Sequence, residues 1–392
     1  MLIVAKRVLV GSGRYLDDGA VLVEGDTIRA VGPEEAVVAE ARPGIERVTF
    51  DGTLLPGLID AHVHLAFDGG PDPVATLDGS SDETLLADMR NRAEDLLRSG
   101  VTTARDLGDR NGLVLRLASD IDGGAAVGPR LVSAGTPLTT PGGHCHFLGG
   151  EVADEEDIRA LVRRNAAAGA GVIKAMVTGG GLTKGGPRSW ESQFSAGDLA
   201  VLVEEAHAAG LPVAAHAHGT PGITAAVSAG VDTIEHCTWM TGDGFDFQED
   251  IVARIVEKGI AVCPAVSPHW QMLPRFFGEE KARAMFDLVR RMADAGVKLV
   301  AGTDAGVQRA SFDGLVPALS FYAHLGLPND RILDMATSIA ADALGLSRTT
   351  GRIADGCKAD LVLVDGDPLA DLNDLSAIRM VIFGGRPLEG RA

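Results

Sequence analysis

The chain has 392 residues, of which 46% are hydrophobic, and its 54 Asp and Glu against 35 Lys and Arg give a formal charge of −19. This length and apolar content suffice for one large buried core with a smaller unit beside it, so a small domain held together by disulfides is excluded. The negative charge repels phosphate backbones and anionic membrane surfaces, so neither nucleic acid nor a membrane is an expected partner.

The N-terminal segment predicts short strands joined by turns. Four strands are expected, at residues 2–10, 19–24, 27–31 and 47–51, with a hairpin turn at Gly25 and Asp26. Two similar runs follow near the other end of the chain, at residues 360–364 and 380–383. We expect the two ends to pair into one small β-sandwich domain, built from residues 1–55 and 350–392.

The start of the sequence and its apolar runs bear on the expected location of the protein. Residues 1–6 lack the basic start and the cleavage site of a secretory signal, and no apolar run approaches the roughly 20 residues of a membrane span. The four cysteines show no C-x-x-C spacing. We therefore expect a cytoplasmic protein with reduced thiols.

Between the two ends, apolar strands alternate with amphipathic helices, a pattern typical of parallel βαβ units. Eight strands are predicted, at residues 58–64, 102–106, 130–133, 171–177, 212–216, 233–236, 261–264 and 298–303. The helices between them include 82–99, 155–168, 196–209, 222–229, 249–258 and 279–295. This alternation predicts an α/β fold with a (β/α)8 TIM barrel over residues 56–349, whose active site lies at the C-terminal ends of the strands.

Residue types that bind metals stand where several of these strands end. They are His62, His64, Lys174, His216, His236 and Asp304. Residues two apart share a strand face, so His62 and His64 can direct both imidazoles at one ion. Asp304 could merely cap the next helix, but the accompanying histidines favour catalysis. Imidazole and carboxylate suit zinc and similar divalent ions, so the set predicts a metal-dependent catalytic centre.

Lys174 is the residue that discriminates between chemistries. An ammonium group at an inward strand end beside divalent cations suffers desolvation and like-charge repulsion, and both lower its pKa and expose a neutral, nucleophilic amine. Carbon dioxide can trap such an amine. The alternative is a lysine that extends into solvent or binds a substrate carboxylate directly.

Five segments of the chain carry a resemblance to a known family. They are residues 56–64, 172–174, 216–219, 234–236 and 302–306. With them, the chain resembles the amidohydrolase superfamily. Residues 174–181 and 216–219 are similar to an imidazolonepropionase-related branch that contains Xaa-Pro dipeptidases, arginine carboxypeptidases and ochratoxin-type amidases.

The resemblance implies a hydrolase with two divalent ions, Zn²⁺ by default, and with N6-carboxylysine at Lys174 bridging them. It implies that a hydroxide shared by the metals attacks the substrate, and that Asp304 acts both as a ligand and as the proton shuttle. Imidazolonepropionases lack this lysine and use one metal, so Lys174 argues against that activity.

The resemblance also implies which residues contact the substrate. His144 would bind the substrate carbonyl or oxyanion. His216 would be the metal ligand and His218 would face the substrate beside it, although His216 and His218 could exchange these roles. His146, in the same glycine-rich loop as His144, and Arg188, in the loop of residues 178–190, are further candidates. Solvated loop surface is the alternative for both.

The expected activity is hydrolysis of a small amide or peptide, such as a dipeptide or an N-acyl amino acid with a free carboxylate. The first alternative is a carbamate, phenylurea or lactam hydrolase that acts on a neutral substrate. A pocket cation near His218 or Arg188 would favour the carboxylate substrate, and a hydrophobic rim would favour the neutral one. A non-catalytic scaffold is the alternative of another class, which the intact ligands oppose. The family also suggests a homo-oligomer.

Overall fold

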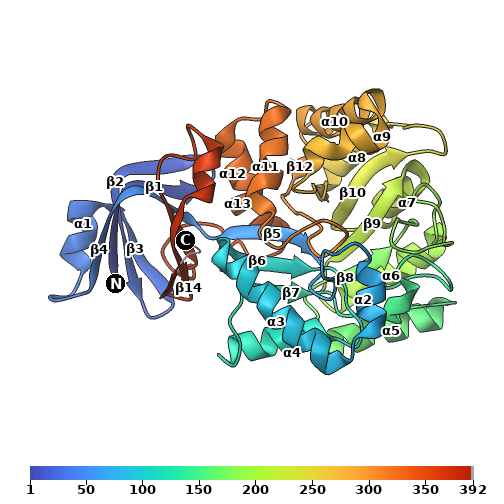
Figure 1. Cartoon of the computed structure of the whole chain (residues 1–392), viewed down its shortest axis with the longest axis horizontal. Helices are drawn as coiled ribbons and strands as arrows, with labels where there is room; N and C mark the ends of the chain where they lie inside the picture. The colour runs from blue at the N-terminus through green and yellow to red at the C-terminus, as the bar shows by residue number, and fades with distance from the viewer. Residues whose placement is uncertain (390–392) are drawn as a thin grey trace.

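The computed structural model describes residues 1–389. A β-rich part holds the N-terminus and the last strands of the chain at one end of the molecule, and a larger α/β part fills the rest (Figure 1). The four cysteines are unpaired and buried. Within the described residues, no helix combines the length and the apolar character needed to cross a membrane.

The β-rich part is one seven-stranded sheet that joins the two ends of the chain. Its order is β15-β14-β13-β4-β1-β2-β3. The strands are β1 (Leu2–Gly11), β2 (Arg14–Glu24), β3 (Thr27–Pro33), β4 (Arg47–Pro56), β13 (Leu361–Val364), β14 (Ile378–Phe383) and β15 (Arg386–Glu389). The central strand β4 runs parallel to β1 and antiparallel to β13. It then passes directly into the α/β part.

The seven-stranded sheet curls so that its edge strand β3 meets the segment before β13. Ile28 N donates to Cys357 O at 2.8 Å, and Ala359 N donates to Asp26 O at 2.8 Å. A buried apolar cluster fills the inside of the curl and includes Ile3, Val8, Val21, Ile28, Leu54, Leu361 and Ile382. Helix α1 (Glu34–Glu40) covers a second small cluster with Val37.

The α/β part contains two parallel sheets. One has the order β5-β6-β7 and the other β12-β11-β10-β9-β8. The strands are β5 (Leu58–Val63), β6 (Val101–Asp106), β7 (Arg130–Ser133), β8 (Ile173–Met176), β9 (Val213–Gly219), β10 (Thr233–Met240), β11 (Ala261–Cys263) and β12 (Lys298–Leu299). Backbone hydrogen bonds also run between the sheets, from Leu138 N to Lys174 O at 2.8 Å and from Asp304 N to His62 O at 2.8 Å.

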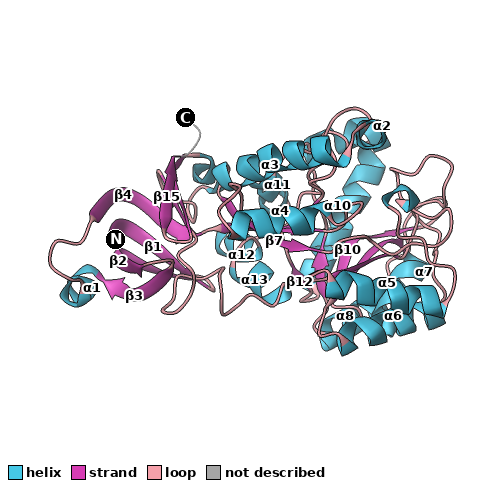
Figure 2. Ribbon diagram, turned by 90° about the horizontal axis from the view of Figure 1, so that it is seen from below, coloured by secondary structure: helices cyan, strands magenta, loops and turns pink. Residues whose placement is uncertain are grey.

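Helices flank these strands (Figure 2). They are α2 (Pro73–Gly79), α3 (Asp82–Arg98), α4 (Leu113–Asp122), α5 (Glu155–Ala167), α6 (Ala196–Ala208), α7 (Thr220–Ala229), α8 (Glu249–Lys258), α9 (Leu273–Phe277), α10 (Glu279–Asp294), α11 (Leu315–His324), α12 (Asn329–Met335) and α13 (Ser338–Ala343), with short 3₁₀ turns η1 (His146–Leu148), η2 (Trp270–Met272) and η3 (Leu372–Ser376). The side chains of Ser81, Asp154 and Ser195 cap α3, α5 and α6. The predicted mixed α/β fold is confirmed, and each predicted helix lies within two residues of an observed one.

Several strands differ in length from the prediction. β2 begins at Arg14 and β4 extends to Pro56, five residues beyond the expected bounds in each case. β9 and β10 run on to Gly219 and Met240, so His218 lies inside a strand. β12 ends at Leu299, four residues earlier than expected. It is short because Ala301 N donates to Met335 O, in the α12 region, instead of continuing the ladder to β11.

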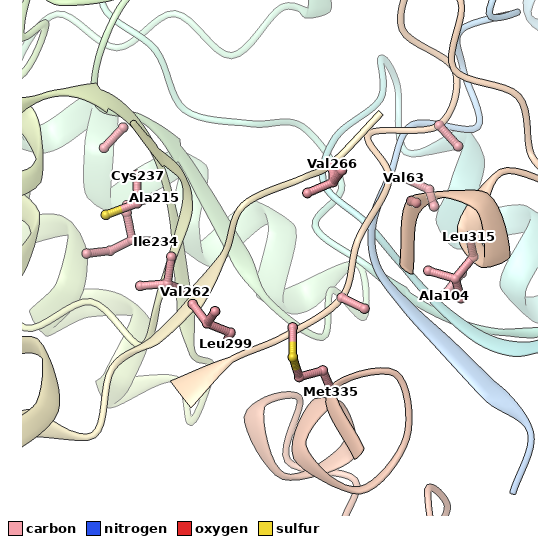
Figure 3. Packing of buried hydrophobic residues seen from close by; sticks show 14 of the residues in the cluster. Val63, Ala104, Ala215, Ile234, Cys237, Val262, Val266, Leu299, Leu315 and Met335 are labelled. Carbon is pink, nitrogen blue, oxygen red and sulfur yellow. The ribbon is translucent and has the colours of Figure 1, made fainter. Parts of the chain in front are cut away.

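Strand alternation separates the core from the functional face. Ala215, Ile234 and Val262 are neighbours across β9, β10 and β11 and pack together with buried residues of the helices (Figure 3). The following residue of each strand points the other way. On β9 and β10 these next residues are His216 and Glu235, so the same register that builds the core brings polar groups together on the opposite face.

Candidate metal-dependent active site

His62, His64 and Asp304 form the first group of potential ligands. His62 Nε2 lies 3.3 Å from His64 Nε2 and 3.2 Å from Asp304 Oδ1, while His64 Nε2 lies 3.4 Å from the same carboxylate oxygen. The two histidines come from the end of β5, and Asp304 follows β12. Burial by itself raises the pKa of Asp304, but the neighbouring His62, His64 and His236 lower it well below its ordinary value. Asp304 is therefore an ionised carboxylate beside two imidazoles.

His216, His218 and His236 form the second group. The ring of His236 lies 4.6 Å from that of His216 and 4.3 Å from that of His218, measured between centroids. The rings of His62 and His236 lie 5.2 Å apart, which makes the two groups contiguous. Because His216 and His218 both lie beside His236, the choice of His216 as the ligand stays a prediction.

Lys174 is an unusual side chain for a protein interior. It is fully buried on β8, and its Nζ has no hydrogen-bond partner within the described part of the chain. Burial lowers the pKa of Lys174 below the ordinary value of a lysine, although Glu235 and Asp304 oppose the shift. An unpaired buried amine is costly. The burial of this amine is explained if the amine is converted into an anionic metal ligand. The imidazole and carboxylate groups around it also suit divalent cations.

A cavity of about 830 Å³, including its open mouth, connects these groups to solvent. Its walls include His64, Lys174, His216, His236 and Asp304. Five of the six predicted ligands therefore face one space. The sixth, His62, is not part of the described wall, but its Nε2 contacts His64 and Asp304.

His144 and His218 also line this cavity. The His144 ring lies 4.7 Å from that of His216, and its Nδ1 is 3.2 Å from the hydroxyl of Thr183. Burial, with the nearby His218 and Lys174, lowers the pKa of His144 to about 3. Burial likewise lowers the pKa of His218 to about 4. Both rings are neutral at pH 7 and can offer an N–H without adding charge.

The structure does not bring the other two predicted substrate contacts into this space. His146 begins η1 and packs against Phe147, with ring centroids 5.9 Å apart. Arg188 is exposed, and its backbone N–H donates to Glu191 Oε2 at 2.7 Å. Neither residue belongs to the described cavity wall. A role for them in binding substrate stays a prediction.

The comparisons with known proteins agree with this geometry. The model of the amidohydrolase family matches residues 53–388. The chain belongs to the amidohydrolase family. It is 27% identical to ochratoxinase from Aspergillus niger over 99% of this chain and 86% of that one, and 26% identical to imidazolonepropionase from Mesorhizobium japonicum over 91% and 88%. A crystal structure of a Xaa-Pro dipeptidase with methionine bound in its active site matches with a TM-score of 0.87, 27% identity and 99% coverage of both chains. The predicted family resemblance is confirmed, and the protein is a hydrolase that acts on C–N bonds.

Glu235 and Arg105 support this amidohydrolase site from behind. The sequence predicted a role for neither, although Glu235 lies in the family-like segment 234–236. His62 Nδ1 donates to Glu235 Oε2 at 2.9 Å, and Arg105 Nη2 donates to Glu235 Oε1 at 2.8 Å. Burial alone would raise the pKa of Glu235, but Arg105 and His62 hold it far below its ordinary value. The carboxylate thereby fixes the tautomer of His62 and leaves Nε2 facing the ligand cluster. An arginine inside the buried strand 101–106 was the available signal.

Replacing Arg105 with Met tests this support. The change leaves Glu235 as an uncompensated buried charge, so we expect a loss of about 3–5 kcal/mol in the free energy of unfolding. We also expect a roughly 10- to 100-fold weaker metal affinity, because His62 is less well oriented. Urea unfolding of metal-free protein and a metal titration measure the two effects. The exposed Arg116, replaced in the same way, is the control, and coincident unfolding curves for the two variants would contradict the assigned role.

Two aspartates hold the loop beneath His64. His64 Nδ1 donates to Gly108 O at 3.4 Å, and Asp106 Oδ1 accepts from Gly108 N at 3.0 Å. Asp109 Oδ2 accepts from Val114 N at 2.6 Å at the start of α4, while its Oδ1 lacks a partner within the described residues. Burial, followed by the charge of Asp106, raises the pKa of Asp109 to about 8.

A pH dependence follows from Asp109 in this amidohydrolase. Because the folded state holds the proton up to about pH 8 and the unfolded chain releases it near pH 4, Asp109 destabilises the fold as pH rises between these values. One proton corresponds to a slope of about 1.4 kcal/mol per pH unit. Asp109→Asn should remove this component, so the variant gains stability relative to the unmodified protein from pH 5 to pH 8. Urea unfolding at several pH values measures the difference, and a constant difference would refute the assignment.

Proposed function

We propose that this amidohydrolase uses two divalent ions, Zn²⁺ by default, to cleave the amide or peptide bond of a small substrate. The observation that carries the proposal is the buried, unpaired amine of Lys174 beside two contiguous groups of ligand side chains. In this proposal, His62, His64 and Asp304 would hold one ion and His216 and His236 would hold the other. Modified Lys174 would be a further ligand of the same centre.

The modification of Lys174 is a carbamate. The lone pair of the neutral amine adds to the carbon of CO₂, so an N–C bond forms while the electron pair of one C=O π bond moves to oxygen. The nitrogen then releases one proton, which leaves a carboxylate that is bonded to the neutral lysine nitrogen and carries a single negative charge on its oxygens. The lowered pKa of Lys174 supports this step because only the neutral amine is a nucleophile. The product, N6-carboxylysine, turns an unpaired amine into an anionic ligand.

The other groups of the cavity have separate roles in the proposed reaction. Bound divalent ions supply Lewis acidity, which makes a water molecule more acidic and polarises the carbonyl group. The ionised Asp304 accepts the proton of the attacking water and returns it to the departing amine, which leaves poorly without it. His144 donates its N–H to the carbonyl oxygen as negative charge develops, a contribution worth about 2.7–4 kcal/mol for one donor. His218 contacts the substrate beside them.

The same proposal includes the finer architecture. The hydrogen bonds between the two parallel sheets support a closed (β/α)8 barrel over residues 56–349. The contact of β3 with the segment before β13 supports a small β sandwich built from residues 1–55 and 350–392. We further propose a cytoplasmic homo-oligomer that acts on small molecules, without nucleic acid or membrane partners.

The first candidate substrate is a dipeptide or an N-acyl amino acid with a free carboxylate. The 27% identity over nearly the whole chain to a Xaa-Pro dipeptidase and to ochratoxinase supports it. The second candidate is a neutral carbamate, phenylurea or lactam. One observation favours it: within the described cavity wall Lys174 is the only Lys or Arg, and Arg188 lies outside. The complete ligand set argues against a non-catalytic scaffold.

A substrate screen on protein of measured metal content tests the proposal. Dipeptides and N-acyl amino acids with varied C-terminal residues are compared with their uncharged C-terminal amides. We expect turnover that rises with metal content up to two equivalents. Preference for the free acids supports the first candidate, and preference for the amides supports the second. Full activity with fewer than two bound ions would overturn the two-metal proposal.

A further inference from the structure

A second cavity, here called the side cavity, lies next to the candidate active site. It encloses about 890 Å³, including its mouth, between the ends of β10 and β11 and the helices α9, α10 and α11. Its walls are apolar and include Met240, Val266, Leu273 and the aromatic rings of Trp270, Phe286 and Phe321. The three aromatic ring centroids lie 5.1–5.9 Å from one another. They form a continuous aromatic floor.

The side cavity shares two residues with the active-site cavity. His218 and His236 belong to the walls of both. Their rings stack with centroids 4.3 Å apart and an interplanar angle of 15°. The two cavities therefore adjoin at this pair of rings.

Three polar side chains in the wall of the side cavity, those of Thr238, Ser267 and Trp270, already have hydrogen-bond partners in the protein. The Thr238 hydroxyl accepts from His218 Nδ1 at 3.0 Å, and the Ser267 hydroxyl accepts from His269 N at 3.1 Å. Trp270 Nε1 donates to Ser320 at 3.0 Å, which leaves only its ring faces and edges for a guest.

The described wall contains no Asp, Glu, Lys or Arg. Lys281 stands nearby but is exposed, with Nζ 5.9 Å from the centroid of Phe277. A charged group inside the side cavity would lose its hydration without gaining a partner. The wall therefore selects against ions.

We propose that the side cavity binds a bulky, uncharged apolar substituent of the substrate, above all an aromatic ring system, attached next to the scissile C–N bond. The inference rests on the proposed hydrolysis and narrows the substrate class of that site to amides with one large apolar group beside the scissile bond. Aromatic guests suit the floor because aromatic pairs favour centroid separations of about 4.5–7 Å. Removal of this group from water supplies the driving force for binding.

The kinetic test uses a substitution that fills the side cavity without touching the histidines. Val289 on α10 lines the side cavity, whereas Asp287 on the same helix is exposed and outside it. Val289→Trp and Asp287→Trp therefore introduce the same side chain inside and outside. Three neutral amides serve as substrates: N-ethylacetamide, N-ethyl-2-naphthamide and N-(2-naphthylmethyl)acetamide. The last two place the ring on either side of the bond.

We expect at least one naphthyl amide to have a kcat/KM about tenfold or more above that of N-ethylacetamide, as hydrophobic pockets discriminate by such factors. Val289→Trp should abolish this preference while kcat/KM for N-ethylacetamide stays within about twofold, and Asp287→Trp should change neither. No preference in the unmodified protein, or an equal loss for all three substrates in Val289→Trp, overturns the proposal.

A binding measurement separates failure of the side cavity from failure of the proposed hydrolysis. Calorimetric titration with 2-acetylnaphthalene, a neutral ketone, should show binding that Val289→Trp eliminates, and 2-naphthoate should bind at least about tenfold more weakly because it is charged. If no amide is hydrolysed but the ketone binds in this way, the hydrolysis proposal falls and the side cavity stands. If amides are hydrolysed and the ketone does not bind, the side cavity falls alone.

Discussion

Replacement of Asp304 with Asn is expected to reduce kcat about 10²- to 10⁴-fold, the range that a positioned general acid–base residue contributes. Asparagine keeps the shape and one oxygen of the side chain, so it can still lie beside His62 and His64. It cannot accept the proton of the attacking water. Because the low pKa of Asp304 keeps it ionised at neutral pH, the loss should be nearly constant across the neutral range.

Metal content decides how the loss in Asp304→Asn is interpreted. Elemental analysis should show bound metal close to that of the unmodified protein, with some loosening because a neutral amide is a weaker ligand. The exposed Asp313, replaced by Asn, is the control for a change of charge. Full turnover in Asp304→Asn would remove this residue from the chemistry. Complete loss of metal would assign it to metal binding alone.

The sequence predicts those parts of the site that depend on the alternation of side chains along a β-strand, in which residues two apart share a face. His62 and His64 are two residues apart where β5 ends, with His64 one residue beyond the strand, and their Nε2 atoms lie 3.3 Å apart. His216 and His218 follow the same rule on β9. The sequence also predicts the α/β alternation, because several helices carry their own apolar stripe and several carry their own caps.

The parts that the sequence does not predict depend on contacts between distant segments. Arg105 and Glu235 are 130 residues apart and meet only because β6 and β10 face the same interior. His236 has a left-handed backbone, with φ 69°, and pairing with β9 is irregular after it, so simple alternation fails there. Arg188 is exposed and outside the described cavity wall, so its predicted contact with substrate stays a prediction. The side cavity depends on how three helices pack, which no local pattern encodes.

Lys174→Met is the second substitution with a large expected effect. Methionine fills a similar volume but cannot form a carbamate, so we expect bound metal to fall below two equivalents and kcat to fall about 10²-fold or more, the scale of losing one key catalytic group. Elemental analysis and steady-state kinetics measure both. Lys184→Met is the matched control, because Lys184 is an exposed lysine whose ion pair with Asp72 contributes little.

The pH dependence of the free energy of unfolding gives a second test of Lys174→Met that is independent of activity. In metal-free, CO₂-free protein, burial keeps the pKa of Lys174 below its ordinary value of 10.5, so the unfolded chain binds the extra proton. That proton favours unfolding below pH 10.5, and the free energy of unfolding therefore rises with pH by up to about 1.4 kcal/mol per unit between the two pKa values. Lys174→Met should lack this rise and be the more stable protein at pH 7. If the variant keeps two ions, full turnover and the same pH dependence of the free energy of unfolding, the amine neither carries the carbamate nor destabilises the fold.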